Sequence, residues 1–272
     1  MTENPKTGFI GAGNMATALI KGLIQSGAYE QDHLFVSDKE EGALKSISTQ
    51  FDLKNYPSNS ELVRECSIVV LSVKPQNIRE VLEEVKEDIR NDQVIISIAA
   101  GIPLSTIGTI IGKDIPLVRV MPNTPALVQK GVSALAGGAL AGPEHMAMAR
   151  KIFNAVGDTV EVEESMMDAV TALSGSGPGY VFRMMECMVN AGASVGLERE
   201  ISMRLVVQTF LGAAHLAKDS EHSLVQLREM VTSPGGTTAE GLATFNKMGL
   251  EEMTIKAVEA ACKRSVELGK DN

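Results

Sequence analysis

Cysteine and histidine, the residues that most often build disulfide frameworks and metal centres, are scarce in this sequence. Among its 272 residues, the three cysteines Cys66, Cys187 and Cys262 lie far apart and form no C-x-x-C pair. The four histidines show neither H-x-x-x-H nor H-E-x-x-H spacing. We therefore expect no disulfide framework, no thiolate zinc site and no catalytic metal.

An excess of basic charge and a long apolar run are also missing. The 25 basic residues face 34 acidic ones, a formal net charge of −9, which disfavours a nucleic acid partner. Gly, Pro or a charge interrupts every apolar run well before the ~20 residues that a membrane helix needs. Residues 1–6 are polar and lack the pattern of an export signal. We expect a cytoplasmic protein with no membrane segment.

The first part of the chain alternates short apolar runs with segments long enough for crossover helices. Such runs are typical of strands buried on both faces of a parallel sheet, so the pattern predicts a doubly wound α/β fold. Two further runs, at 131–135 and 159–162, flank a predicted helix over 143–155 and should extend the same sheet. The main predicted strands are Gly8–Ile10, Leu34–Val36, Ile68–Leu71, Val94–Ser97 and Leu117–Val120.

After residue 163 the composition changes, which predicts a second, all-helical domain over 164–272. This part holds nine of the fourteen methionines but only Pro178 and Pro234 of the ten prolines. The segment Ile201–Leu216 is apolar around most of its circumference, whereas a surface helix shows a single apolar stripe. We therefore expect this domain to pack against a second copy of itself. The predicted helices are Met166–Ser174, Tyr180–Val195, Glu200–Lys218, Ser223–Met230, Thr237–Met248 and Leu250–Leu268.

A glycine-rich turn follows the first predicted strand and opens a helix that runs to about Ser26. In the sequence Gly11-Ala12-Gly13-Asn14-Met15-Ala16, Gly11 permits a tight turn, Gly13 lets a pyrophosphate approach the backbone, and a small residue at 16 allows close packing. The alternative is an ordinary glycine-containing turn. The position of the motif favours a Rossmann dinucleotide-binding domain over residues 1–163.

The end of the second predicted strand normally distinguishes between the two nicotinamide coenzymes. Asp38 lies there, and a carboxylate favours the free 2′-hydroxyl of NAD. Its neighbours Ser37 and Lys39 could instead bind the 2′-phosphate of NADP. Asp38 could also be a solvated loop residue or a helix cap, so the local signals conflict.

Three more strand ends should face the same ligand, because dinucleotide folds bind it at the carboxyl ends of parallel strands. The first carries Val73-Lys74-Pro75, the second Ala99-Ala100-Gly101, and the third contains Asn123 between two prolines. A solvated lysine and plain turn chemistry remain the alternatives.

A second glycine-containing turn, Ser233-Pro234-Gly235-Gly236-Thr237-Thr238, leads into a predicted helix. A helix N-terminus offers unpaired N–H groups and a positive dipole end, so it can bind a carboxylate. Capping by Thr237 or Thr238 is the structural alternative. The segment Ser174-Gly175-Ser176-Gly177-Pro178 is predicted to be another turn before a helix.

Taken in order, the segments GAGNMA, VKP, SIAAG, MPNTP, SGSGP and VTSPGGTT make this chain resemble the pyrroline-5-carboxylate reductases across residues 7–268. The resemblance implies a Rossmann domain, a helical domain interleaved between two subunits, and further assembly that includes decamers. It also implies NADPH- or NADH-dependent reduction of 1-pyrroline-5-carboxylate to L-proline. A protonated imine is already an electrophile, so this reaction needs no metal and no acid–base cluster.

The resemblance also implies roles for individual residues. The N–H groups of Gly236, Thr237 and Thr238 would bind the substrate carboxylate, and the Thr238 hydroxyl would lie near the ring nitrogen. Glu221 would be an electrostatic partner at the edge of the site. Further residues implied in binding substrate are Ser174, Ser233 and Gly235, and those implied in binding coenzyme are Gly11, Gly13, Asn14, Met15, Ser37, Asp38, Asn59, Val73, Lys74, Pro75, Ala99, Ala100 and Asn123.

The chain departs from the family pattern at two points. Gly179 stands where an alanine is usual, and Asp38 stands where NADPH-binding members often carry Ser, Asn or Arg. The family favours NADPH and Asp38 favours NADH, so the coenzyme preference stays open.

Two other functions are compatible with a dinucleotide fold. A β-hydroxyacid dehydrogenase or another imine reductase is one, although the former needs a catalytic lysine and the helix after Ser174 offers none before Lys218. A non-catalytic dinucleotide-binding module is the other, and it gives the 233–238 turn no role.

Overall fold

The computed structural model describes residues 4–270, which form two compact units. The first unit runs to Ser176 and takes up the chain again from Ala260. The second unit is Gly177–Glu259.

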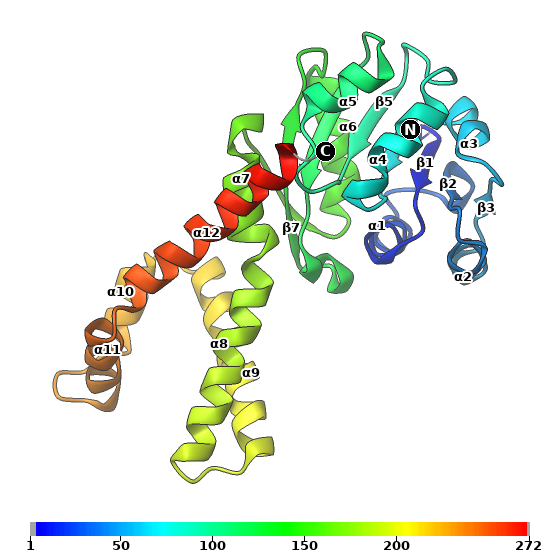
Figure 1. Ribbon diagram of the computed structural model, residues 1–272. Coiled ribbons are helices and arrows are strands. Elements are labelled where there is room, and N and C mark those ends of the chain that lie inside the picture. The colour runs from blue at the N-terminus through cyan, green and yellow to red at the C-terminus, as the bar shows by residue number, and fades with distance from the viewer. Residues whose placement is uncertain (1–3, 271–272) are drawn as a thin grey trace. The chain divides into compact units, whose positions relative to one another are not determined.

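The first unit is built on one eight-stranded sheet with the strand order β3-β2-β1-β4-β5-β6-β7-β8 (Figure 1). Neighbouring strands are parallel except for the pair β6 and β7. The strands are β1 (Thr7–Ile10), β2 (Leu34–Ser37), β3 (Lys54–Asn55), β4 (Ile68–Leu71), β5 (Val94–Ser97), β6 (Leu117–Met121), β7 (Gly131–Gly137) and β8 (Gly157–Glu161).

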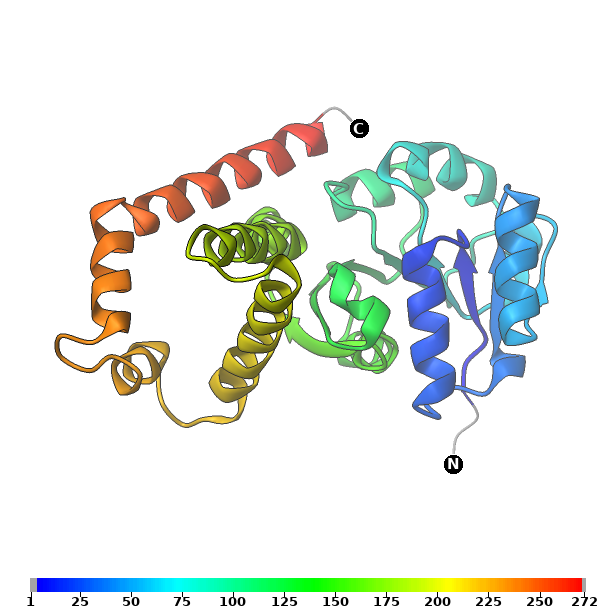
Figure 2. The same ribbon diagram turned by 90° about the horizontal axis from the view of Figure 1, so that it is seen from below.

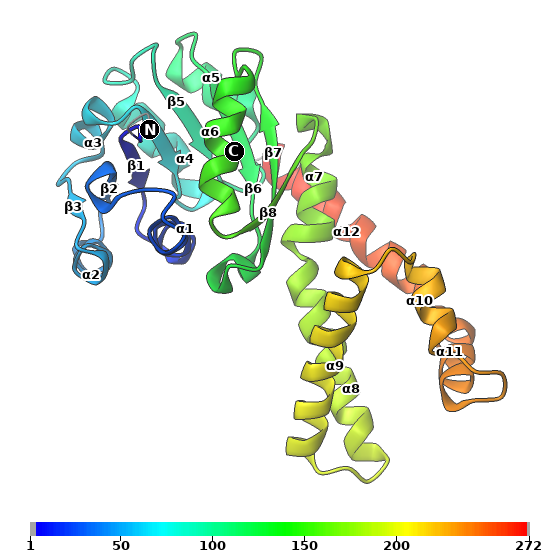
Figure 3. The ribbon, with the colours of Figure 1, turned by 180° about the vertical axis from the view of Figure 1, so that it is seen from behind.

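Helices cover both faces of this sheet, because successive side chains of each strand point to opposite faces. Phe9 belongs to a core with α1, α2 and α6, and its neighbour Ile10 belongs to a core with α3, α4 and α5. Figure 3 shows α6 in front of the sheet, and Figure 1, the view from the opposite side, shows α4 in front of it. The helices are α1 (Asn14–Gln25), α2 (Glu41–Phe51), α3 (Asn59–Glu65), α4 (Ile78–Val85), α5 (Leu104–Ile111) and α6 (Pro143–Asn154).

The α/β class predicted from the sequence is confirmed, and the predicted strands agree with the observed ones to within two residues at each end. The structure adds β3, whose two residues are polar and exposed. It also shows that β7 runs antiparallel to β6. At Gly157 the backbone has φ +149°, and a Cβ there would lie 1.9 Å from the Gly131 carbonyl oxygen, so only glycine fits at this junction of β7 and β8.

The second unit is helical, as predicted. It contains α8 (Gly177–Ser194), α9 (Arg199–Asp219), α10 (Leu224–Met230) and α11 (Thr237–Lys247), together with the start of α12 (Leu250–Lys270), whose later residues belong to the first unit. Helices α8 and α9 pack side by side and run in opposite directions (Figures 1 and 3). Figure 2 follows the chain from α9 through α10 and α11, coloured yellow to orange.

The predicted turn before the first of these helices is wrong. After α7 (Met167–Val170), residues Thr171–Gly175 form a π-helical turn, and α8 begins at once with Gly177. Pro178 is tolerated because it occupies the first turn of α8, where a backbone N–H has no partner within the helix. The small residues therefore belong to a nearly continuous helical stretch.

Within the described residues, no helix is both long and apolar enough to span a membrane.

Candidate functional site

A cleft of about 340 Å³ lies where β1, β2 and β4 end. The order of the sheet reverses here, since the chain runs outward from β1 to β2 and β3 and then returns to β4 on the other side of β1. Ligands of open α/β sheets bind at such switch points, outside the carboxyl ends of the strands. The position and volume of the cleft suit a nucleotide-sized ligand.

The glycine-rich turn forms one wall of the cleft. Gly11 has φ +105°, and a Cβ there would lie 2.8 Å from the Ser72 carbonyl oxygen, so this position requires glycine. Gly13 differs, because a Cβ there would meet no atom within 4 Å. Gly13 is the N-cap of α1, which has no side-chain cap and no acidic residue in its first turn. The wall thus combines open space with a helix N-terminus, a suitable place for an anionic group.

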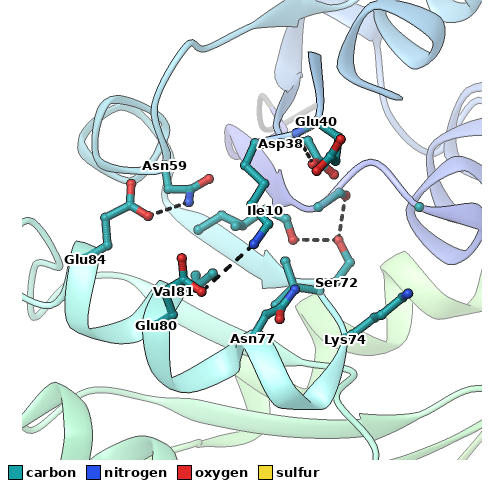
Figure 4. Close-up of a pocket in the computed structure, with 14 residues that line it drawn as sticks. Ile10, Asp38, Glu40, Asn59, Ser72, Lys74, Asn77, Glu80, Val81 and Glu84 are labelled. Atoms are coloured by element: carbon teal, nitrogen blue, oxygen red, sulfur yellow. Dashed lines mark hydrogen bonds and ion pairs between the residues drawn. The ribbon is translucent and has the colours of Figure 1, made fainter. Parts of the chain in front are cut away.

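Hydrogen bonds hold this turn in place. The Gly11 N–H donates to the Ser37 carbonyl oxygen (2.8 Å). The Ser72 hydroxyl lies 2.9 Å from the carbonyl oxygens of both Ile10 and Gly11, as the dashed lines in Figure 4 show. The ends of β1, β2 and β4 are therefore fastened to one another around the cleft.

Asp38 adds a side-chain bond to this frame. One of its carboxylate oxygens accepts a hydrogen bond from the Ala12 N–H (2.6 Å), and the other accepts one from the Glu40 N–H (2.8 Å). Asp38 also lines the cleft. Its side chain thus lines the cleft and also supports the glycine-rich turn, a second role that the sequence analysis did not predict.

Asn59 connects β2 with α4. Its amide oxygen accepts a hydrogen bond from the Ser37 hydroxyl (2.8 Å), and its amide nitrogen donates to Glu84 (2.8 Å). Ser37 is buried and is not among the residues that line the cleft, whereas Asn59 and Glu84 are (Figure 4).

The structure brings together about half of the coenzyme residues expected from the sequence. Those that line the cleft are Gly11, Gly13, Asp38, Asn59, Val73 and Lys74. Those outside its lining are Asn14, Met15, Ser37, Pro75, Ala99, Ala100 and Asn123. Four lining residues that the sequence reasoning missed come from α4 and the turn before it, namely Asn77, Glu80, Val81 and Glu84. Their place in the sequence could have indicated them, because they lie in or just before the helix that follows β4, one of the strands whose ends form the cleft.

Asn123 lies in the loop after β6 and contacts the π-helical turn. Its amide oxygen accepts a hydrogen bond from the Val132 N–H (3.0 Å), and its amide nitrogen lies 3.4 Å from both oxygens of Ser174. One residue expected to bind coenzyme and one expected to bind substrate are thus neighbours within the first unit.

The turn at 232–236 and helix α11 lie in the second unit. Gly235 has φ +69°, which favours glycine, and a Cβ on Gly236 would lie 2.4 Å from the Ser233 hydroxyl oxygen, so this hydroxyl would have to move. The Gly236 N–H donates to the Ser233 carbonyl oxygen (3.0 Å). Gly236 is the N-cap of α11, and no side chain caps this helix. The structural alternative, a cap formed by Thr237 or Thr238, is therefore not observed.

Glu221 lies in the exposed link between α9 and α10. It belongs to the second unit with Ser233, Thr237 and Thr238, while Ser174 belongs to the first.

Comparison with known proteins gives a consistent result. Residues 164–268 match the family described as pyrroline-5-carboxylate reductase dimerisation, and residues 6–101 match the family described as NADP oxidoreductase coenzyme F420-dependent. The chain is 42% identical to a pyrroline-5-carboxylate reductase of Methanosarcina acetivorans, over 98% of this chain and 99% of that protein.

Solved structures agree with these matches. A pyrroline-5-carboxylate reductase from Coxiella burnetii superposes with a TM-score of 0.93 at 36% identity, over 97% of this chain and 98% of the other. The enzyme of Plasmodium falciparum, solved with NADP bound, superposes with a TM-score of 0.86 at 35% identity, over 99% of this chain and all (100%) of the other.

Proposed function

The chain belongs to the pyrroline-5-carboxylate reductase family, and we propose that it reduces 1-pyrroline-5-carboxylate to L-proline with NADPH or NADH, the last step of proline synthesis. The observation that carries this proposal is identity of 42% over 98% of the chain, which includes both the glycine-rich turn and the 232–238 turn. A different imine reductase or a hydroxyacid dehydrogenase has no comparable support.

The coenzyme cleft is proposed at the switch point of the sheet. The open backbone at Gly13 and the uncapped start of α1 fit a pyrophosphate, because a phosphate needs N–H donors and close approach to the chain. The relative from Plasmodium falciparum holds NADP, which supports the same class of ligand here. When bound, the reduced nicotinamide supplies the hydride.

The substrate carboxylate is proposed to bind at the N-terminus of α11. Since the Gly236 N–H is used within the turn, the N–H groups of Thr237 and Thr238 remain as the carboxylate donors. Gly235 and Ser233 shape the turn that holds these donors. The Thr238 hydroxyl is proposed to stabilise the amine that forms from the imine, and Glu221 and Ser174 to contribute at the edges of the site.

The domain division and assembly are part of the same proposal. We assign residues 1–163 to coenzyme binding and 164–272 to dimerisation and substrate binding. The dimerisation family matches residues 164–268, which supports an interleaved dimer, and decamers would be built from such dimers. Three unpaired cysteines suit a reducing compartment, so we place the enzyme in the cytoplasm.

The test is direct. The purified chain is mixed with 1-pyrroline-5-carboxylate and either reduced coenzyme, and nicotinamide absorbance and proline are both measured. We expect one proline for each coenzyme oxidised. Oxidation of coenzyme by hydroxyacid partners but not by the cyclic imine would overturn the proposal, and coenzyme binding without turnover of any imine would favour the non-catalytic alternative.

A further inference from the structure

The cleft carries charges that bear on which coenzyme it accepts. We propose that this chain binds NADH in preference to NADPH and that Asp38 sets the preference. The inference rests on the proposed function, because it takes the switch-point cleft to be the coenzyme site. It goes beyond that function by selecting between two ligands that differ by one phosphate on the adenosine ribose.

The position of Asp38 is the first argument. In dinucleotide folds the adenosine ribose lies at the end of the second strand, and Asp38 directly follows β2 and lines the cleft. Two backbone N–H groups, those of Ala12 and Glu40, hold its carboxylate at 2.6 and 2.8 Å. The carboxylate is thereby fixed, so a 2′-phosphate could not displace it without breaking both bonds.

The remaining lone pairs of that carboxylate suit a ribose with a free 2′-hydroxyl. Each carboxylate oxygen accepts about two hydrogen bonds, and one on each oxygen is used by the backbone. Asp38 can therefore still accept from ribose hydroxyls, which a phosphate group does not offer.

The two donors next to Asp38 that could bind a 2′-phosphate already have partners. The Ser37 hydroxyl is buried and donates to Asn59. The Lys39 ammonium lies 4.0 Å from the carboxylate of Glu80, another residue of the cleft. Exposed pairs of this kind are weak, but a phosphate would have to compete with Glu80 for the lysine.

The net charge of the residues that line the cleft also favours NADH over NADPH. Among the described residues of the cleft, the carboxylates of Asp38, Glu40, Glu80 and Glu84 outnumber the ammonium groups of Lys39 and Lys74. Figure 4 shows the acidic side chains on two sides of the cleft, Asp38 and Glu40 beside the end of β2 and Glu80 and Glu84 on α4. A 2′-phosphate would add about two negative charges to a cleft that is already acidic.

The experiment measures coenzyme binding without substrate. NADH and NADPH are titrated into the purified protein and followed by nicotinamide fluorescence at low and high salt. We expect the Kd for NADH to be lower by roughly tenfold or more at low salt, with the ratio shrinking as salt screens the repulsion.

Two variants test whether Asp38 causes the preference for NADH. Asp38→Asn keeps an oxygen acceptor for a backbone N–H but removes the charge, and it should reduce the preference for NADH by roughly tenfold. Glu41→Gln is the matched control, because Glu41 lies at the start of α2 and lines a separate hollow. It should leave the ratio of the two Kd values unchanged.

Competition on the unmodified protein adds a readout that does not depend on a variant's folding. Adenosine 5′-monophosphate should displace NADH more effectively than adenosine 2′,5′-bisphosphate. Equal or tighter binding of NADPH, or stronger competition by the bisphosphate, would overturn the preference. An unchanged ratio in folded Asp38→Asn would overturn the role of Asp38. Failure of both coenzymes to bind would instead count against the proposed function.

Discussion

The two compact units bury their apolar side chains to very different extents. In the first, strands β1, β2, β4 and β5 are buried at every position, and two continuous cores flank the sheet. In the second, α8 buries only Val189 and α9 only Ser202 and Val206, whereas Leu205 of α9 is 54% exposed and Phe182 of α8 is 59% exposed. A unit of the first kind can be stable alone, and one of the second kind needs a partner surface. The match of residues 164–268 to a dimerisation family agrees with that conclusion.

The largest effect expected from this contrast concerns assembly. Replacing two exposed apolar residues of α9, as in Leu205→Asp combined with Leu211→Asp, should convert the dimer to a monomer, because buried unpaired charges are costly at an apolar interface. Sedimentation at micromolar concentration measures this, and coenzyme binding by the first unit should persist. Ser105→Glu, at an exposed position of α5, is the control. The prediction is wrong if the double variant still sediments as the original chain does.

The next effect tests the first unit alone. Gly13→Val should weaken coenzyme binding by roughly 100-fold, about 2.8 kcal/mol, because its side chain would occupy the open space beside the α1 N-terminus. Gly42→Val is the matched control, since a Cβ there also meets no atom within 4 Å but lies on α2 outside the cleft. Fluorescence titration measures both. Equal coenzyme affinity in folded Gly13→Val would contradict the proposed pyrophosphate position.

A smaller effect tests the second unit. Thr238→Ala should lower kcat/KM for the imine by roughly tenfold, about 1.4 kcal/mol, and leave coenzyme affinity unchanged. Its Tm should stay the same, because Gly236 is the N-cap of α11 and no side chain caps the helix. Thr244→Ala on the same helix, whose hydroxyl donates to the Glu240 carbonyl oxygen, is the control. A lower Tm with normal kcat/KM would remove Thr238 from the active site.

The smallest effect compares two cysteines. Burial raises the pKa of the Cys66 thiol to about 12, so this thiol stays protonated and unreactive at about pH 8. Cys187 on α8 is exposed in the single chain. Thiol titration of the folded protein should therefore miss Cys66 and detect it only after denaturation, and a Cys66→Ala variant should lack that increase. Labelling of Cys66 in the native protein would show that the core between the sheet and α3, α4 and α5 opens readily.

Much of the first unit could be predicted because its strands are short apolar runs bounded by turn residues. The strands Ile68–Leu71 and Val94–Ser97 were predicted to the residue, since each is buried on both faces. Strand β3 was missed because Lys54 and Asn55 are polar and exposed, so no apolar pattern marks them. The direction of β7 was also not predicted, because the apolar pattern of a strand does not indicate whether it pairs parallel or antiparallel.

Composition was misleading at the segment 174–178. Ser, Gly and Pro usually indicate a turn, yet this segment continues a helical path through a π-helical turn into α8. A Cβ on Gly175 would press against the end of Met121, so packing gives this glycine a reason other than a turn.

The candidate site was predictable only in part, because its decisive contacts join distant parts of the chain. The motif at 11–16 predicted the open backbone at Gly13, which the structure contains. No local pattern could indicate that Asp38 accepts a hydrogen bond from Ala12, or that Asn59 links Ser37 with Glu84. The acidic residues of α4 were missed because only the strand ends were expected to contact the ligand, and not the helix that follows β4.

The bond between Asp38 and the Ala12 N–H has a consequence for engineering this enzyme. The same carboxylate that would discriminate between coenzymes also fastens the loop after β2 to the glycine-rich turn. A replacement without a side-chain acceptor, such as Asp38→Ala, would therefore loosen the turn as well and weaken the binding of either coenzyme. Such a replacement needs a second substitution that restores an acceptor for the Ala12 N–H, so the two changes are epistatic, and their order decides whether the intermediate variant remains functional.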